Sequence, residues 1–235
     1  MALTYLDYDS KLFGFRVGRI TGSSDHENLS ADLETARAEG YKVLYWSTVP
    51  EEAEIGKELG GKLADLRRNY SRDITTMGHY ELAANWFICA WNAEEDVPER
   101  LFELAEIAGH ESRFNDPGFG KDALQKLYRD WVRRSAQREI AEELLYVEDF
   151  GSIRSMLTIE LKEGRPQIGL VATRSEDAGR GMAGDLVRSA VVWSINRGYK
   201  ELAVVTQSAN DSANRFYQKL GFEIEREEAV FHFWL

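Results

Sequence analysis

A glycine-rich stretch at residues 174–184 follows an apolar run, QIGLVAT at residues 167–173, and precedes a helical pattern at residues 183–197. Glycine lets the main chain approach a ligand closely, and the free amides and dipole of a helix start favour a phosphate group. Arg174 and Arg180 would add charge-assisted contacts. A tight strand-to-helix turn also explains the glycines, so this stretch alone leaves both interpretations open.

A second stretch, NDSANRFYQKLGF at residues 210–222, combines an amide, two aromatic residues and a terminal glycine. Asn210 is expected to cap a helix, and Tyr217, seven residues later, then lies on the same side of that helix. A tyrosine hydroxyl beside a leaving thiolate can donate a proton as a general acid. Taken alone, however, an aromatic residue of an amphipathic helix is more often part of a core.

The two stretches are more informative together, because each follows a predicted buried strand, at residues 167–173 and 201–207. If these strands are adjacent and parallel, both helices begin at the same edge of the sheet. One helix start would then bind a pyrophosphate, while the other helix presents Tyr217 to a thioester.

The elements that must position these residues follow from hydrophobic periodicity and turn residues. Helices are expected at residues 28–39, 51–59, 98–108, 122–138, 183–197 and 211–220. Strands are expected at residues 12–20, 41–49, 85–92, 144–150, 152–161, 167–173, 201–207, 222–225 and 229–235. Antiparallel strands followed by a strand–loop–helix–strand–helix–strand order predict an α+β, or mixed α/β, fold.

Composition restricts the class of partner. The 235 residues carry a net charge of −11, which disfavours nucleic acid as a partner. The single cysteine, Cys89, excludes an internal disulfide, and His26, His79, His110 and His232 show no metal-ligand spacing, so no metal is expected. No apolar run is long enough for a membrane span and no secretory signal is evident, so a cytoplasmic location is expected.

The two stretches resemble the acetyl-CoA-binding and C-terminal segments of the GCN5-related N-acetyltransferase (GNAT) superfamily. The cofactor pattern of that family, usually Q/R-x-x-G-x-G/A, falls on Ala178, Gly179, Arg180, Gly181, Met182 and Ala183. Ala178 replaces the usual Gln or Arg, which removes one side-chain contribution but no amide. The stretch at residues 210–222 is similar to N-x-x-A-x-x-F-Y-x-K-x-G-F at every position.

This resemblance implies a GNAT fold, with a central mixed, mostly antiparallel sheet flanked by helices, and acetyl-CoA as the cosubstrate. It implies that Tyr217 protonates the CoA thiolate and that Asn210 contacts CoA. The amides of Leu170, Val171 and Ala172 would bind the pantetheine arm and polarise the thioester carbonyl. Direct attack by a primary amine then needs no covalent enzyme intermediate.

A finer resemblance links YDSKLFGFRVGRI (residues 8–20) and SRFNDPGFGKDALQKLYRDWVRRS (residues 112–135) to dTDP-4-amino-4,6-dideoxygalactose (dTDP-fucosamine) N-acetyltransferases. These enzymes acetylate the 4-amino group of a nucleotide-linked sugar. The resemblance implies two parts, a truncated GNAT-like unit at residues 1–80 and an acetyltransferase domain at residues 81–235.

The acceptor side is less defined by the sequence. Arg113 could contact a substrate phosphate beside Phe114, or pair with Asp116 and fix its own loop, and the structural role is slightly favoured. The candidate general bases are Glu148, Glu160, His110 and His232, and water is an alternative.

Three other functions stay open: acetylation of another small amine or of a protein N-terminus, a non-catalytic acyl-CoA sensor, and a purely structural module. The small-molecule amine is the expected partner, and a homodimer is not excluded.

Overall fold

The computed structural model describes residues 2–22, 25–75 and 86–235. Its strands are β1 (Ala2–Tyr5), β2 (Val17–Thr21), β3 (Val43–Thr48), β4 (Lys62–Asp73), β5 (Phe87–Ala90), β6 (Glu143–Asp149), β7 (Ser152–Lys162), β8 (Arg165–Thr173), β9 (Glu201–Gln207) and β10 (Glu223–Trp234). Its helices are α1 (Asp7–Phe13), α2 (His26–Ala38), α3 (Ala53–Glu58), α4 (Glu99–Ala108), α5 (Ala123–Ala136), α6 (Met182–Asn196) and α7 (Asp211–Lys219). The predicted boundary between residues 80 and 81, and His79, lie outside the described residues.

All the described strands belong to one ten-stranded sheet, in the order β1-β2-β3-β10-β4-β9-β8-β7-β6-β5. The pairs β2–β3 and β8–β9 are parallel, and the other pairs are antiparallel. The predicted mixed, mostly antiparallel sheet flanked by helices is therefore confirmed. The division into residues 1–80 and 81–235 stays a prediction, because the sheet runs through both parts.

The first half of the predicted strand at residues 12–20 is wrong, because Asp7–Phe13 form α1. Gly14 ends this helix with a φ of 78° and donates its N–H to the Ser10 carbonyl oxygen. Glycine adopts this left-handed conformation without strain, so the chain turns here and enters β2.

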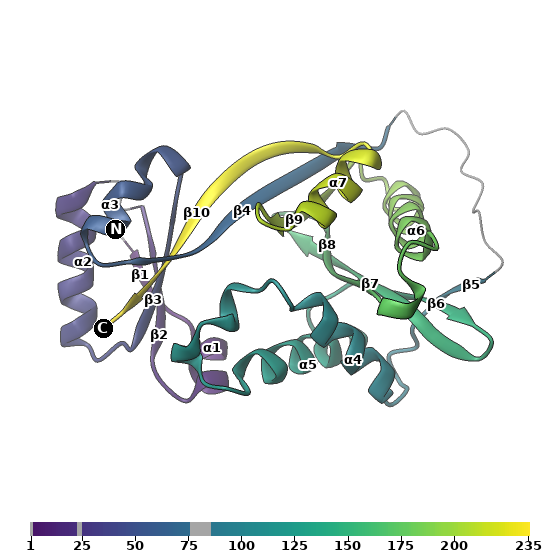
Figure 1. Ribbon diagram of the computed structural model, residues 1–235, viewed down its shortest axis with the longest axis horizontal. Coiled ribbons are helices and arrows are strands. Elements are labelled where there is room, and N and C mark those ends of the chain that lie inside the picture. Colours follow the sequence, from purple (N-terminus) through teal and green to yellow (C-terminus); the bar gives the residue numbers. More distant parts are fainter. Residues whose placement is uncertain (1, 23–24, 76–85) are drawn as a thin grey trace.

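Two long strands connect the N-terminal elements with the rest of the molecule. Figure 1 shows β4 and β10 side by side, running from the end with α2 and α3 to the end with α7. The sequence did not predict β4, because charged residues interrupt its apolar pattern. Cross-strand ion pairs Arg67–Glu228 and Arg68–Glu227 join it to β10 and explain those charges. The predicted strands 222–225 and 229–235 form one continuous strand.

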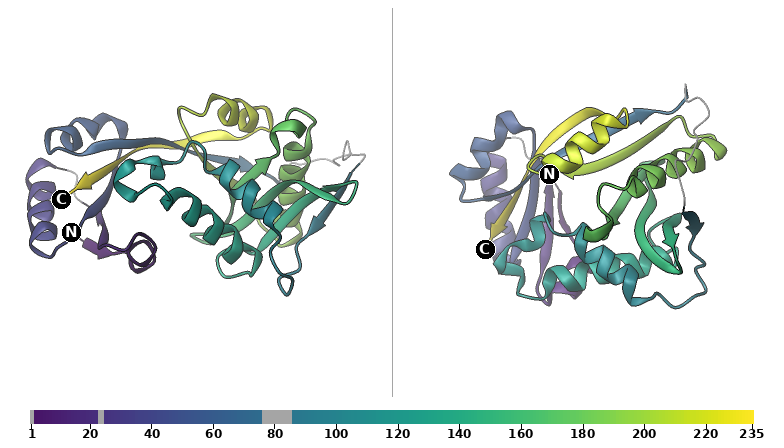
Figure 2. Two further views of the ribbon diagram at one scale, coloured as in Figure 1. Left: turned by 60° about the horizontal axis from the view of Figure 1, so that its bottom comes forward. Right: turned by 45° about the vertical axis from the view of Figure 1, so that its right-hand side comes forward.

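Helices cover both faces of the sheet, and the residues of β4 show which helices share a face. Leu66 packs against the core beneath α2, and Tyr70 packs into the core beneath α6 and α7. Alternate residues of a strand point to the same side, so α2, α6 and α7 lie on one face. The cores beneath α4, α5 and α1 lie on the other face (Figure 2).

None of the described helices combines the length and apolar composition that crossing a membrane requires.

Candidate active site

The predicted neighbours β8 and β9 are adjacent and parallel, as the argument from the two helices requires. Their register includes only two residue pairs, Gln167 with Ala203 and Ile168 with Val204. Beyond Ile168, the rest of β8 has no pairing with β9, so the two strands diverge toward their carboxyl ends. This opening lies between the starts of α6 and α7, and backbone groups of β8 face it.

The three predicted backbone amides on β8 do not all face the opening. The Leu170 N–H donates to the Thr158 hydroxyl on β7 at 2.8 Å, and the Ala172 carbonyl oxygen accepts from Ser155 on β7. Because main-chain groups of successive strand residues point to opposite sides, the amide of Val171 points toward β9. The prediction for Leu170 and Ala172 thus needs correction: their polar groups bind β7, and Val171 carries the amide at the opening.

A bulge next to these residues explains why β8 departs from regular pairing. The register between β7 and β8 shifts between Leu157 and Ile159. At Gly169, a Cβ atom would lie 2.2 Å from an oxygen of Glu160, so this position accepts only glycine. The Glu160 carboxylate is buried and accepts from Trp131 Nε1 at 3.0 Å, which connects the bulge to α5.

The loop before α6 presents free amides at its helix start. Gly179 and Gly181 have φ values of 78° and 96°, which L side chains rarely adopt. Gly181 is the N-cap and provides no side chain to the first amides of α6, those of Met182 and Ala183 among them. Uncapped amides together with the helix dipole favour an anion, so the geometry is compatible with the phosphate interpretation, which stays a prediction.

The arginines near this loop are already paired with acids. Arg180 binds Asp177 at 2.6 Å and Asp149 at 3.2 Å, and Arg174 pairs with Glu176. These carboxylates offset the positive charge of the two arginines that the sequence analysis expected to contact phosphate. The main-chain amides are therefore the main hydrogen-bond donors that this loop offers to an anion. Ala178 is exposed, with a short side chain that adds no donor.

Tyr217 lies on α7 with only 3% of its surface exposed, in an aromatic cluster with Tyr70 and Phe222. The core around it also contains Met182 from the start of α6 and Val171 from β8. The structure therefore brings together three segments that the sequence analysis selected separately. Within the described residues, the Tyr217 hydroxyl has no hydrogen-bond partner, which leaves its proton available to a ligand.

Burial raises the pKa of Tyr217 well above its usual value, so the hydroxyl stays protonated at all physiological pH values. A thiol has a pKa of about 8.5, lower than that of this tyrosine. A hydroxyl in this position is therefore suited to stabilise a departing sulfur by a hydrogen bond as charge develops, or to supply its proton.

Asn210 caps α7, as predicted, because its side-chain oxygen accepts from the Ala213 N–H at 3.0 Å. The sequence analysis missed Asn214, one turn later. Its side-chain amide donates to carbonyl oxygens of Gln207, Ser208 and Asn210, and its oxygen accepts from the Tyr70 hydroxyl at 2.8 Å. Asn214 thus fixes α7 and Tyr217 relative to β9 and β4; a polar residue on the buried side of a helix was the available signal.

The candidate general bases differ in their surroundings. His110 is exposed and lies beside Glu111, and both oxygens of Glu160 are bound, by Trp131 and Lys162. The His232 Nε2 atom lies 2.7 Å from an Arg113 nitrogen, and burial lowers the pKa of His232 to about 3. Glu148 lies on β6, two strands from β8. Water stays an alternative proton acceptor, and the general base stays a prediction.

Arg113 and Phe114 lie between the N-terminal strands and α5, and Arg113 does not pair with Asp116. Asp116 binds Lys62 of β4 at 2.9 Å instead. The Arg113 guanidinium lies 4.2 Å from the ring centres of both Tyr45 and Phe114. Pairing of Arg113 with Asp116, which sequence reasoning slightly favoured, is therefore wrong.

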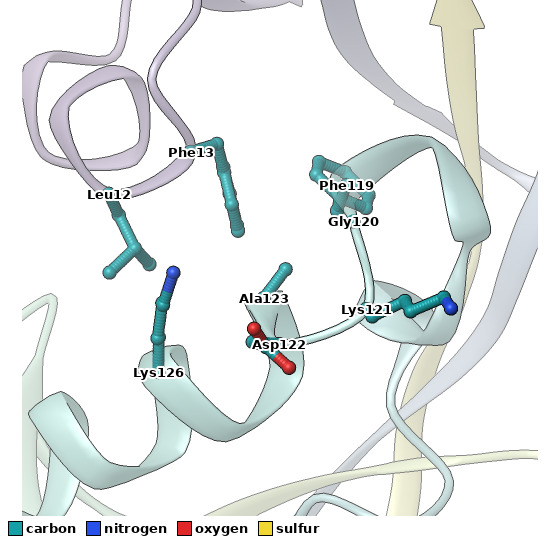
Figure 3. A pocket seen from close by; sticks show the side chains of 8 residues that line it. All are labelled: Leu12, Phe13, Phe119, Gly120, Lys121, Asp122, Ala123 and Lys126. Carbon is teal, nitrogen blue, oxygen red and sulfur yellow. The ribbon is translucent and has the colours of Figure 1, made fainter.

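Figure 3 shows a hollow between α1 and the first turn of α5, where Phe13 and Phe119 face each other and Lys126 points toward Leu12. Its volume is about 200 Å³, below the roughly 300 Å³ at which ligand pockets begin. A second hollow, of about 440 Å³, lies beside Gly221 and the ends of β4 and β10. Neither includes Tyr217 or the loop before α6. Within the described residues, no cluster of His, Cys, Asp or Glu could hold a metal ion.

Comparisons with known proteins show which sequences this chain resembles. Residues 145–231 match the family model described as FR47-like protein. The dTDP-fucosamine acetyltransferase of Escherichia coli is 31% identical over 134 residues, which are 56% of this chain and 57% of that protein. The spore coat polysaccharide biosynthesis protein SpsD of Bacillus subtilis is 23% identical over 58% of this chain and 47% of that protein. The chain thus spans about half the length of these curated relatives.

The fold has a counterpart among solved structures. A tandem GNAT protein from the clavulanic acid biosynthesis pathway matches with a TM-score of 0.62 and 13% identity, over 92% of this chain and 74% of that chain. This likeness establishes the GNAT fold.

Proposed function

From an FR47-like segment within a GNAT fold, we propose that this chain transfers an acetyl group from acetyl-CoA to a primary amine. One observation carries the proposal: Tyr217, protonated and without a hydrogen-bond partner in the described chain, lies in one core with Met182 and Val171 at the β8–β9 opening. A general acid, an anion-binding helix start and a strand amide are the groups that this reaction needs.

The cofactor would bind mainly to main chain. The amides of Gly179, Gly181, Met182 and Ala183 would bind the pyrophosphate. The amides of Arg180 and Ala178 donate to the Asp177 and Ser175 carbonyl oxygens, at 3.4 and 3.3 Å, and would have to turn from them to take part. The pantetheine arm would lie along β8 and complete its edge, with the Val171 N–H donating to the thioester carbonyl oxygen. Asn210 would contact CoA through its exposed surface, because its side-chain oxygen already caps α7.

The reaction would be a direct attack. The neutral amine nitrogen forms a bond to the thioester carbon, and the developing oxyanion is stabilised by the Val171 amide. The carbon–sulfur bond then breaks, the electron pair leaves with sulfur, and the Tyr217 hydroxyl supplies a proton or a strong hydrogen bond. The amine would lose its extra proton to water, because burial lowers the pKa of His232 to about 3 and both oxygens of Glu160 are bound.

For the acceptor, we propose the 4-amino group of a nucleotide-linked amino sugar. The names of two relatives support this choice: one is a dTDP-fucosamine acetyltransferase and the other acts in spore coat polysaccharide biosynthesis. The segments at residues 8–20 and 112–135, which resemble such enzymes, also meet in the structure, since the Tyr8 hydroxyl donates to Asp130 at 2.8 Å.

The direct experiment measures CoA release. The protein is incubated with acetyl-CoA and a panel of amines that includes dTDP-4-amino-4,6-dideoxygalactose, a polyamine, an amino acid and a peptide with a free N-terminus. Release with the sugar nucleotide supports both the reaction and the acceptor. Release with another amine alone keeps the reaction and rejects the sugar. Acetyl-CoA binding without release from any amine rejects the proposed transfer in favour of an acyl-CoA sensor.

A further inference from the structure

Arg113 is a partly buried cation that forms no salt bridge with the described residues, and Asp9 acts on it electrostatically from a longer distance. No carboxylate of the described residues lies within ion-pair distance of its guanidinium, whose contacts are His232 and the rings of Tyr45 and Phe114. Burial lowers the pKa of Arg113, as expected where the charged form loses water. A cation in this position is costly unless an anion joins it.

Two further polar groups beside Arg113 are buried. Nδ1 of His232 has no hydrogen-bond partner among the described residues, and this residue is fully buried. Since Arg113 can only donate, His232 Nε2 must accept, and the ring proton of neutral His232 is then on Nδ1. The Tyr45 hydroxyl, on a residue with 2% of its surface exposed, interacts with the partly buried Asp9 carboxyl group, whose pKa burial raises. His232 thus provides one unused donor beside the guanidinium, and Tyr45 a second donor whose neighbour is a carboxyl group that ionises less readily than usual.

The loop that carries Arg113 is fixed firmly enough to make this arrangement a built site. Asp116 binds Lys62 of β4 and also accepts from the Gly118 N–H. At Gly118, a Cβ atom would lie 2.3 Å from the ring of Trp234, so this turn of the loop is held against β10. Arg113 is therefore placed by contacts to β4 and β10, independently of any pair of its own.

A row of polar residues on β4 leads from Arg113 toward the active site. Asp65, Arg67 and Asn69 alternate along the strand and so share the face opposite Tyr70. The Nδ2 atom of Asn69 is buried and has no hydrogen-bond partner among the described residues. From Asp65 to Asn69, the strand spans roughly 13 Å. Arg67 pairs with Gln207, the last residue of β9, so this row reaches the end of β9 that precedes α7, and an extended acceptor would be needed to span from Arg113 to the β8–β9 opening.

We propose that Arg113, Tyr45 and His232 form the site for the phosphate groups of the acceptor, and that Arg67 and Asn69 line the way from this site to the β8–β9 opening. The ligand class is a nucleoside diphosphate, which carries the anionic oxygens that match three donors of this kind. This inference rests on the proposed function in one respect: the amine at the other end of the ligand is taken to be the group that is acetylated. It means that the acceptor is selected by side chains of β3, β4, β10 and the loop before α5, and not by the loop that would bind the cofactor.

Charges around the site are compatible with an anion. Arg19 and Arg67 both act electrostatically on Arg113, so three guanidinium groups share this region. The two nearby carboxylates hold their protons more tightly than usual: burial raises the pKa of Asp65 to about 6 and also raises that of Asp9. A carboxyl group that protonates easily repels phosphate less and can donate to it.

The test measures binding of dTDP and of inorganic pyrophosphate by titration calorimetry, in the absence of acetyl-CoA. We expect dTDP to bind the unmodified protein, Arg113→Lys to weaken binding about tenfold or more, and Tyr45→Phe to weaken it about fivefold. Asp9→Asn, which changes the group that the Tyr45 hydroxyl faces but leaves Arg113, Tyr45 and His232 in place, should retain or increase dTDP affinity. Comparing Tyr45→Phe with Asp9→Asn therefore separates a ligand contact from a structural role.

Arg129→Gln is the matched control, because Arg129 is an arginine of the same loop–α5 region that binds Glu99 and Glu106 on the surface. Its dTDP affinity should equal that of the unmodified protein. The site is refuted if Tyr45→Phe and Arg113→Lys both bind dTDP as tightly as the unmodified protein does. It is also refuted if the unmodified protein binds neither dTDP nor pyrophosphate. Binding of dTDP that these variants weaken, in a protein that acetylates no amine, keeps the site and refutes the proposed function.

Discussion

The segment from β8 to α7 and the junction around Arg113 are built in opposite ways. The first is one continuous stretch of chain, and the groups it offers are mostly backbone amides released by Gly179 and Gly181 and by the divergence of β8 and β9. The second collects side chains from β3, β4, β10 and the loop before α5, which are far apart in the sequence.

This difference suggests that the two regions bind different substrates. A cofactor that is the same for every acceptor can be bound by main chain, whose geometry depends on glycine and on helix starts more than on side-chain identity. An acceptor must be distinguished from other amines, which requires specific side chains. The long strands β4 and β10 belong to both regions and set the distance between them (Figure 1).

The largest effect is expected at Tyr217. Replacing Tyr217 with Phe removes the proton donor to the leaving sulfur and should lower kcat by about 100-fold or more, since general acids contribute 10²- to 10⁴-fold. The hydroxyl has no hydrogen-bond partner among the described residues, so the melting temperature should not fall. Steady-state kinetics with acetyl-CoA and thermal unfolding check both parts.

Tyr70→Phe is the matched control, because Tyr70 lies in the same aromatic cluster and its hydroxyl does have a partner, Asn214. It should lose about 1 kcal/mol of unfolding free energy and keep most of its kcat. Equal kcat in Tyr217→Phe and the unmodified protein would remove Tyr217 from the mechanism.

A smaller effect is expected at the start of α6. Gly181→Ala places a Cβ atom at a φ of 96° beside the free amides, in space that the folded protein leaves open. The strain and the added methyl group should raise KM for acetyl-CoA about tenfold. KM for acetyl-CoA, measured at saturating acceptor, checks this.

Gly198→Ala provides the same backbone strain, at a φ of 83°, beyond the other end of α6. It should lose a similar amount of stability and keep its KM for acetyl-CoA. If both variants raise KM equally, helix stability rather than the amide site governs cofactor binding.

The smallest effect concerns Asp65 in the acceptor region. Burial raises its folded pKa to about 6, above the usual 3.8, so its ionised form costs stability. That cost is absent below about pH 4, grows between pH 4 and pH 6, and is complete above pH 6. Asp65→Asn should therefore raise the unfolding free energy at pH 7.5 by about 1 kcal/mol and leave it unchanged at pH 4.

Asp73→Asn, on the same strand, should act in the opposite direction. Hydrogen bonds from Thr75 lower the pKa of Asp73, so its ionised form stabilises the fold above about pH 4. Denaturant unfolding at both pH values separates the two cases. A loss of stability in Asp65→Asn at pH 7.5 would show that this carboxylate acts as an ion-pair partner in the folded protein.

The sequence predicted the elements from β8 to α7 well, because its signals are local. The strand, the glycines and the helix start follow one another within residues 167–197, and the Asn210 cap and Tyr217 are seven residues apart. What it missed there depends mainly on neighbouring strands: Thr158 of β7 accepts the Leu170 amide, and Asp149 of β6 binds Arg180.

The junction around Arg113 was predicted poorly, because its contacts join distant segments. The pair Arg113 and His232 is separated by 119 positions, and nothing in the local pattern indicates that they meet. Similarly, β4 carries charged residues that form ion pairs with β10. These residues interrupt its apolar pattern, so hydrophobic periodicity did not reveal the strand. Asp116 was within local reach of Arg113, but Lys62 binds it.

One kinetic comparison tests the division between the two regions most directly. KM for acetyl-CoA and KM for the sugar-nucleotide acceptor are measured for Gly181→Ala and for Arg113→Lys. The account predicts that Gly181→Ala raises only the first constant and that Arg113→Lys raises only the second, each about tenfold. If Arg113→Lys raises KM for acetyl-CoA, or if both variants raise both constants equally, the two regions do not bind separate substrates and the account is contradicted.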